Sequence, residues 1–286
     1  GQIDVCIADF LGTTSNVPLK GPVPTILFQH NVEYVIWKRL KDVDGKAWRR
    51  ALLDLEWRKM RRHEAQACRQ SALTITVSDS DRDLIVAEAP GANVHSIPTG
   101  VDLNYYAPNG WRENPVELVF TGSMDWYPNE DGMLHFIDAT LPQIRREMPN
   151  VSLTIVGRNP TNRLKSAAVR AGVNVTGTVD DVRPYMAHAA VYVVPLRVGG
   201  GTRMKIFEAL SMGKAVVSTT VGAEGLPLTD GKNFIRADNS EEFAAAVLSL
   251  LKDPARRGAL GRAGRELVEK RHSWAHVAME FAARCR

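Results

Sequence analysis

One stretch of the chain decides its fold: Pro-Leu-Arg-Val-Gly-Gly-Gly-Thr-Arg-Met-Lys-Ile-Phe-Glu-Ala-Leu-Ser-Met-Gly-Lys-Ala-Val-Val-Ser-Thr, residues 195–219. A buried-strand pattern ends at Pro195, three glycines follow, and a helix is predicted to begin around Thr202. A second strand is predicted at 215–219. A strand, a glycine-rich loop and a helix in this order are typical of a parallel α/β sheet, which binds ligands at the carboxyl ends of its strands.

Two cations, Arg203 and Lys205, lie in the first turn of this predicted helix. Positive side chains oppose the helix dipole at that end, so their position indicates a bound anion such as a phosphate. Glu208 follows, and a carboxylate there can accept hydrogen bonds from both hydroxyls of a ribose. The alternative is a tight glycine turn with a solvated lysine, which leaves the two cations unexplained.

The same alternation of strands and amphipathic helices extends outward in both directions and predicts two Rossmann-like halves. We expect residues 111–270 to form a nucleotide-binding domain, with strands at 117–121, 152–156, 173–176, 190–195 and 215–219 and a helix near 131–146. Residues 1–110 are expected to form a partial Rossmann-like domain, with strands at 3–8, 25–29, 73–77 and 95–98. A final helix, residues 271–286, is expected to cross back to it.

The basic side chains are concentrated in two regions. The 286 residues carry a formal net charge of +4, which is too small to imply nucleic acid as a partner. Residues 38–69 hold eleven Lys and Arg against five Asp and Glu, and residues 252–286 hold nine against four. Residues 38–69 are predicted to be a long basic helix, read either as a solvated face or as a surface for anionic lipid.

The three cysteines, Cys6, Cys68 and Cys285, are far apart and lack metal-ligand spacing. A structural metal or a disulfide framework is therefore not expected, and a reducing compartment is the default. The longest apolar runs are strand-sized. We expect a cytoplasmic protein, with the alternative of a peripheral position at the inner face of the membrane.

Several motifs together resemble a known family. They are residues 195–219, Val119-Phe-Thr-Gly-Ser-Met, Leu153-Thr-Ile-Val-Gly, Val175-Thr-Gly-Thr-Val and Val221-Gly-Ala-Glu-Gly. In this order they are similar to the nucleotide-sugar domain of GT-B glycosyltransferases of family 4, the retaining group 1 type. His30-Asn-Val-Glu, Val77-Ser-Asp and Ile97-Pro-Thr-Gly-Val-Asp resemble, more weakly, the end of the acceptor domain.

The resemblance implies transfer of a sugar from a UDP- or GDP-linked donor to a glycan or lipid-linked acceptor, without a metal cofactor. Arg203 and Lys205 would neutralise the departing diphosphate, and His30 would face the reaction centre. Val179 would touch the base through its backbone, with Arg158 beside it. The residues expected to bind the donor are Gly122, Ser123, Arg158, Val179, Gly200, Gly201, Thr202 and Glu208.

This chain departs from the family pattern at two places. The first of the family's two glutamates falls on Gly200, so sugar binding must differ, while Glu208 matches the second. The basic pair after the first strand of the domain is absent, and Asn129 and Asp131 stand near there. Arg203 and Lys205 are the candidates to replace it.

Glu33 and Glu64 are expected to tie down the interdomain helix by hydrogen bonds or ion pairs, and Asp180 with Asp181 is expected to cap a short helix. The first half has too few strands for a full domain, so we expect a truncated or minimal transferase. Two other functions stay open: a non-catalytic nucleotide- or lipid-binding module, and a nicotinamide-dependent oxidoreductase. The second is disfavoured because no G-x-G-x-x-G motif exists. No Walker A motif exists either, which disfavours a P-loop NTPase.

Overall fold

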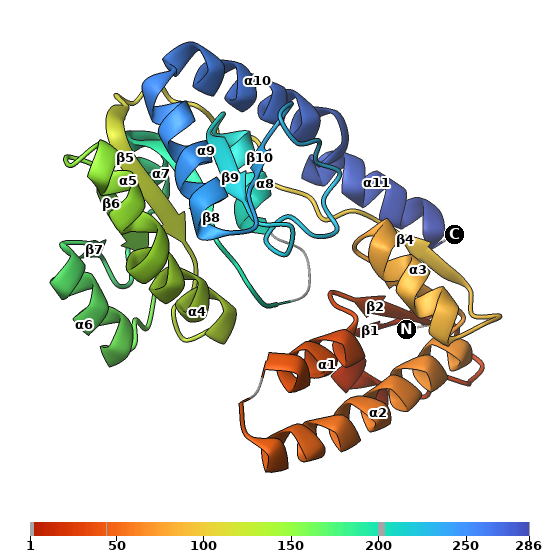
Figure 1. Ribbon diagram of the computed structural model, residues 1–286. Helices are drawn as coiled ribbons and strands as arrows, with labels where there is room; N and C mark the ends of the chain where they lie inside the picture. The colour runs from red at the N-terminus through yellow and green to blue at the C-terminus, as the bar shows by residue number, and fades with distance from the viewer. Residues whose placement is uncertain (1–2, 44, 200–203, 286) are drawn as a thin grey trace. The chain divides into compact units, whose positions relative to one another are not determined.

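The computed structural model describes residues 3–43, 45–199 and 204–285 (Figure 1). These residues fall into two compact units. Unit 1 contains residues 3–43, 45–100, 199 and 275–285, and unit 2 contains residues 101–198 and 204–274. Within the described residues, no helix is long and apolar enough to cross a membrane.

Unit 1 is built on a sheet of four parallel strands in the order β1-β2-β3-β4. These are β1 (Cys6–Asp9), β2 (Thr25–Gln29), β3 (Leu73–Thr76) and β4 (Val94–Ser96). The strand predicted at 25–29 is confirmed with these bounds, whereas the one predicted at 3–8 begins three residues later. On the sheet, Val277 of α11 (Trp274–Arg284) packs with Ile26 and Ile75.

The long basic helix predicted at 38–69 is two helices, α1 (Glu33–Val43) and α2 (Ala47–Gln70). Gly45 lies between them, and glycine is a poor helix former. Apolar spacing on α2 predicts two stripes, one of Trp48, Ala51, Leu52 and Leu55 and one of Leu53, Trp57, Met60 and Ala67. The second is the inner face: Ala67 is buried beside Leu27, and Trp57 and Met60 pack against the same cluster. The other stripe is exposed: Trp48 is 63% and Leu52 56% accessible. Amphipathic spacing alone does not say which stripe is buried.

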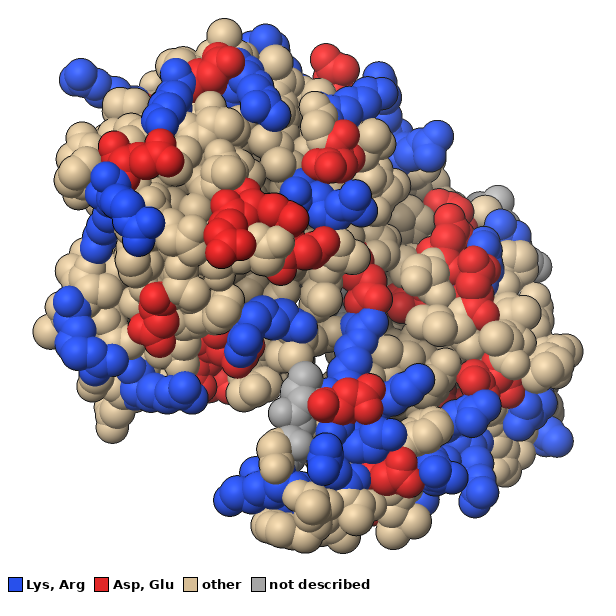
Figure 2. Space-filling model, in the orientation of Figure 1, with Lys and Arg blue, Asp and Glu red and all other residues tan. Residues whose placement is uncertain are grey.

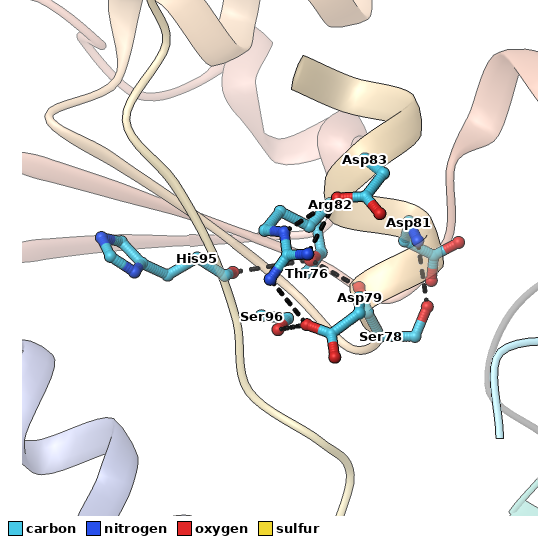
Figure 3. Close-up of polar contacts among 8 residues, drawn as sticks. All are labelled: Thr76, Ser78, Asp79, Asp81, Arg82, Asp83, His95 and Ser96. Atoms are coloured by element: carbon cyan, nitrogen blue, oxygen red, sulfur yellow. Dashed lines mark hydrogen bonds and ion pairs between the residues drawn. The ribbon is translucent and has the colours of Figure 1, made fainter. Parts of the chain in front are cut away.

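Unit 1 also holds two elements that the sequence did not predict, the 3₁₀ helix η1 (Leu11–Ser15) and the helix α3 (Asp79–Glu88). Ser78 Oγ caps α3 by accepting from the Asp81 N–H at 3.0 Å (Figure 3). Asp79 accepts from Arg82 Nη1 at 2.7 Å and from the hydroxyl of Ser96, which ends β4 (Figure 3). The Val77-Ser-Asp stretch therefore starts a helix and ties it to the sheet edge.

Unit 2 is built on six parallel strands in the order β10-β9-β8-β5-β6-β7. They are β5 (Asn114–Thr121), β6 (Ser152–Val156), β7 (Asn174–Val175), β8 (Ala189–Val194), β9 (Ala215–Ser218) and β10 (Ile235–Arg236). The strand order reverses at β5, which pairs with β8 on one side and β6 on the other. In open α/β sheets this reversal marks the ligand-binding edge.

The helices of unit 2 follow the predicted alternation. They are α4 (Tyr127–His135), α5 (Leu141–Glu147), α6 (Asn162–Ala171), α7 (Arg183–His188), α8 (Met204–Ser211), α9 (Ser240–Lys252) and α10 (Pro254–Arg271). The helix predicted near 131–146 begins earlier, with Pro128 in its first turn, and it contains a π-helical turn (η2, Phe136–Thr140) between α4 and α5. Phe120, Tyr192 and Phe207 are buried in the core of this unit.

Candidate functional site

The loop after β5 leaves room for a lysine side chain because its first residue is Gly122. A Cβ atom at Gly122 would lie 2.7 Å from Lys205 Nζ and 2.8 Å from Asn129 Nδ2. Real Cβ atoms do not approach that closely, so any larger residue would displace the lysine. The Gly122 N–H donates to Val156 O at 2.9 Å, which holds the loop against the end of β6.

Gly157 joins this loop to the loops after β6 and β7. A Cβ at Gly157 would lie 1.7 Å from Gly122 O, so the two backbones touch in a way that only glycine permits. The Gly157 N–H donates to Gly177 O at 3.2 Å. Three adjacent loops at the carboxyl edge of the sheet are thereby fixed to one another.

Lys205 places a positive charge at this edge. It lies in α8, and its Nζ donates to Asn129 Oδ1 at 2.7 Å and lies 4.1 Å from the centre of the Phe120 ring. Lys205 therefore lies beside Asn129, near the position where the family's basic pair is missing. Four other predicted residues, Gly200, Gly201, Thr202 and Arg203, lie outside the described residues.

Ser123, which follows β5, and Arg158, which follows β6, contact each other. Arg158 Nε donates to Ser123 Oγ at 2.8 Å, and Ser123 Oγ donates to Asp125 Oδ1 at 2.5 Å. The second oxygen of Asp125 accepts from Asn159 Nδ2 at 2.8 Å. Hydrogen bonds from Ser123 and Asn159 lower the pKa of Asp125, which keeps this carboxylate ionised. Asp125 was not predicted as part of the site.

Glu208 is half-buried one turn after Lys205, and the Tyr106 hydroxyl donates to its carboxylate. Burial raises the pKa of Glu208, while the Tyr106 hydrogen bond and the charge of Lys205 act in the opposite direction. The carboxylate thus already accepts from a hydroxyl, the kind of bond that a ribose would offer. Tyr106 comes from the irregular segment before β5, where no motif marks it as functional.

An ion pair that was not predicted involves Asp131 of α4. Arg197, which follows β8, donates to Asp131 through Nε at 3.0 Å and Nη2 at 2.7 Å. The acid at the position of the missing basic pair is therefore already neutralised. Its arginine partner precedes the glycine-rich loop by two residues, and nothing in the pattern had linked the two.

Val179 is half-buried against the core of unit 2, beyond Gly177. The expected cap at Asp180-Asp181 is only partly correct, because the residue at the cap position is Val182, which lacks a side-chain oxygen. Asp181 Oδ1 instead accepts from the Arg183 N–H at 2.9 Å and pairs with the same arginine side chain. No group of three metal-binding side chains occurs among the residues that the structure describes.

His30 lies in unit 1, directly after β2. Its Nε2 is 2.8 Å from Asp9 Oδ1, and its ring stacks on Phe10 with a centroid separation of 4.1 Å. Phe10 has φ of 69°, a conformation that a bulky residue rarely adopts. Phe28 contacts the other side of the imidazole edge-on at 4.8 Å. The imidazole is therefore held in one orientation by three neighbours.

Glu64 fixes the start of α1 by hydrogen bonds, one of the two kinds of contact expected of it. Its side chain is fully buried, and its two oxygens accept from the N–H groups of Glu33 and Tyr34, each at 3.0 Å. Burial raises the pKa of Glu64 to about 7. It also raises the pKa of Glu33. Glu64 is a helix cap supplied by another helix, so its role is structural.

The switch-point sheet and the interlocked loops around Lys205 define an open parallel α/β domain with a ligand-binding edge. Residues 115–253 match the family model of glycosyl transferases group 1. Through these residues the chain belongs to that family, which places it among the GT-B glycosyltransferases.

Individual relatives and structures agree with this assignment. The phosphatidyl-myo-inositol mannosyltransferase of Mycobacterium tuberculosis is 30% identical over 221 residues, covering 72% of this chain and 57% of the relative. A GDP-mannose-dependent phosphatidylinositol monomannoside mannosyltransferase of Mycolicibacterium smegmatis is 28% identical over 214 residues, covering 66% of this chain and 55% of the relative. The chain thus spans a little over half the length of both.

Among solved structures, Anabaena HepE in complex with UDP and glucose superposes with a TM-score of 0.76. The match covers 98% of this chain and 77% of HepE at 16% sequence identity. At this identity the superposition shows the fold, which is the GT-B arrangement of parallel sheets and helices expected from the sequence.

Proposed function

We propose that this chain performs retaining transfer of a sugar from a UDP- or GDP-linked donor to a glycan or lipid-linked acceptor. The observation that carries the proposal is the position of Lys205, held beside Gly122 by Asn129 and the face of Phe120. A cation fixed next to glycine loops at the switch point of a parallel sheet suits a diphosphate.

The proposed reaction needs little from the protein except charge. The bond between the anomeric carbon and the diphosphate oxygen breaks, the acceptor oxygen attacks from the same face, and the departing diphosphate takes the acceptor proton. Lys205, with Arg203, would neutralise the negative charge that grows on the diphosphate. Donors placed before the reaction stabilise such charge without reorganisation, which is how this kind of site accelerates a reaction. We propose that no metal takes part.

The nucleoside is proposed to lie over Glu208, whose carboxylate would exchange the Tyr106 hydroxyl for those of the ribose. Val179 would meet the base through its backbone, and Arg158 would lie beside it. The relatives support a nucleoside diphosphate sugar as donor, since one is named for GDP-mannose and one neighbouring structure holds UDP.

The acceptor is proposed to be approached at an anionic membrane surface by α2. Trp48, Leu52 and Leu55 form one exposed apolar stripe on this helix, with 50–63% of each side chain accessible. Basic residues flank the stripe, and Lys and Arg side chains gather over this part of the molecule (Figure 2). An apolar stripe within a basic face is typical of helices that lie in a lipid interface. His30 is proposed to face the sugar that is transferred.

The experiment that tests the function is release of UDP or GDP from a panel of nucleotide sugars, with and without lipid extract as acceptor. We expect turnover by the wild type, unchanged by EDTA, and a loss of tenfold or more in Glu208→Ala. Glu147→Ala serves as the control because Glu147 is exposed and pairs with Lys252 at 2.6 Å. Nucleotide binding without any turnover would contradict the enzyme proposal and favour the non-catalytic module.

A further inference from the structure

A second basic site lies in unit 1, among residues that the proposed transfer does not use. It is a cavity of about 320 Å³ between α2 and the end of α3. Four arginines line it, Arg58, Arg61, Arg62 and Arg69, together with Trp57, Ala65 and Glu88. Cavities of this size hold small organic ligands rather than single waters.

The four guanidinium groups share one side of α2 because of their spacing. Arg58 and Arg62 are four residues apart, and Arg61 and Arg69 fall on the same side of the helix, with Ala65 between them. Like charges at this spacing destabilise a helix. Ala65 is 6% accessible, and its methyl group leaves a hollow where a longer side chain would fill the space.

Acidic partners neutralise only part of this charge. Glu88 pairs with Arg61 at 2.5 Å, and its backbone carbonyl accepts from Arg69 at 3.2 Å. Asp54, outside the lining, pairs with Arg58 at 2.9 Å. In the described part of the chain, Arg62 has no hydrogen bond or ion pair. Two carboxylates therefore face four guanidinium groups.

Trp57 lines the cavity, and its ring lies close to two of the arginines. The guanidinium carbons of Arg58 and Arg61 lie 5.6 and 5.8 Å from the centre of its ring. The indole N–H donates to Asp54 at 3.0 Å, which fixes the ring in place. Guanidinium groups held over an aromatic face keep their edge donors available for an anion.

We propose that this arginine cavity binds the phosphate of a phosphomonoester. An uncompensated charge of two matches a phosphate dianion, and the fork-shaped donors of arginine match its oxygens. Arg62 would supply the first contact, because its donors have no other partner among the residues that the structure describes. The volume exceeds that of inorganic phosphate and leaves room for the esterified group. The site is separate from the donor site in its residues, and it does not depend on the transfer reaction.

The first test measures binding of inorganic phosphate and of glycerol 3-phosphate to the full-length chain by calorimetry. We expect saturable binding of the ester that weakens about tenfold or more in Arg62→Gln, the effect of losing one charged hydrogen-bonding group. Arg50→Gln is the matched control, because Arg50 lies on the same exposed helix, carries the same charge and does not line the cavity.

The second test distinguishes a lipid headgroup from a free phosphate ester. Vesicles with phosphatidic acid, a monoester, are compared with vesicles of phosphatidylglycerol at matched surface potential. A preference for phosphatidic acid that Arg62→Gln removes and Arg50→Gln keeps would identify a lipid source. No such preference, with glycerol 3-phosphate binding still lost in Arg62→Gln, would identify a soluble ester. Equal effects of the two variants in both tests would overturn the proposal, whatever the result of the donor-turnover assay.

Discussion

Gly122 shows how one missing side chain shapes the candidate donor site. In Gly122→Ala the added methyl group would sit 2.7 Å from Lys205 Nζ, the flexible end of a long side chain. The lysine end can move away, but Gly122 has a φ of 157°, which L residues rarely adopt. We therefore expect some loss of stability together with affinity for UDP or GDP reduced by about tenfold. Calorimetry checks the affinity. Gly12→Ala is the control, because nothing lies within 4 Å of its added Cβ. Unchanged affinity in Gly122→Ala would contradict the role of Lys205.

Glu64 makes the stability of the protein depend on pH. Burial raises the pKa of its carboxyl from 4.5 to about 7, so folding favours the protonated form. The contribution of this group is fully present below pH 4.5 and is lost as the pH rises through 7. The loss amounts to up to about 3 kcal/mol of the free energy of unfolding.

In Glu64→Gln this dependence should disappear, because an amide does not titrate in this range. Denaturant unfolding at several pH values measures it, and the slope between pH 4.5 and 7.5 is the quantity to compare. Glu56→Gln, on the same helix, should keep the wild-type slope. Parallel slopes for wild type and Glu64→Gln would show that the carboxyl does not titrate in this window.

The exposed apolar residues of helix α2 are expected to contribute to lipid binding but little to the stability of the fold. Trp48 is 63% and Leu52 56% accessible, so replacing both by Ser should change the free energy of unfolding by less than about 0.5 kcal/mol each. Binding to anionic vesicles should fall by tenfold or more, since two large apolar side chains would no longer enter the lipid.

Vesicle co-sedimentation measures this loss. Val169→Ser is the control, because Val169 is an apolar residue of α6 that is 81% accessible and lies in unit 2. If both proteins lose binding equally, the exposed stripe of α2 is not the lipid-binding face. A large loss of stability in the double variant would instead show that the stripe packs against protein.

Alternating hydrophobic patterns predicted most elements, but some boundaries and links depend on three-dimensional contacts. The strands at 25–29 and 152–156 follow from apolar runs bounded by turn residues. The helix α3 was missed because its periodic signal is weak, although Ser78 followed by Asp79 and Asp81 is a start signal. The break between α1 and α2 was missed because charged side chains continue across it, although the helix ends at Val43 and a new one begins at Ala47.

The residues of the candidate site also fall into two groups, those with a local sequence signal and those brought together only by the fold. Lys205 and Glu208 were predicted as site residues from the glycine-rich stretch, because a helix start carries a local signature. Tyr106 and Arg197 were not found, since each meets its acidic partner only through the fold. Pairing between residues distant in sequence leaves no periodic trace in a single chain.

For the whole molecule, the family match and the switch-point geometry of unit 2 both support membership of the glycosyl transferases group 1 family. The match covers residues 115–253, and Gly122, Gly157, Lys205 and Glu208 all fall within it. His30 and the arginine cavity lie outside it, in unit 1. Assays of the full chain are therefore needed to connect donor binding, which unit 2 is proposed to supply, with transfer.

The most direct test of the central claim compares nucleotide and nucleoside binding by Lys205→Ala. Titrations of UDP, GDP, uridine and guanosine are measured for this variant, the wild type and Lys165→Ala, an exposed lysine of α6. We predict that Lys205→Ala weakens UDP or GDP binding by about tenfold or more and leaves nucleoside binding nearly unchanged, because Lys205 is proposed to hold the diphosphate. Equal losses for nucleoside and nucleotide, or no loss for either, would contradict it.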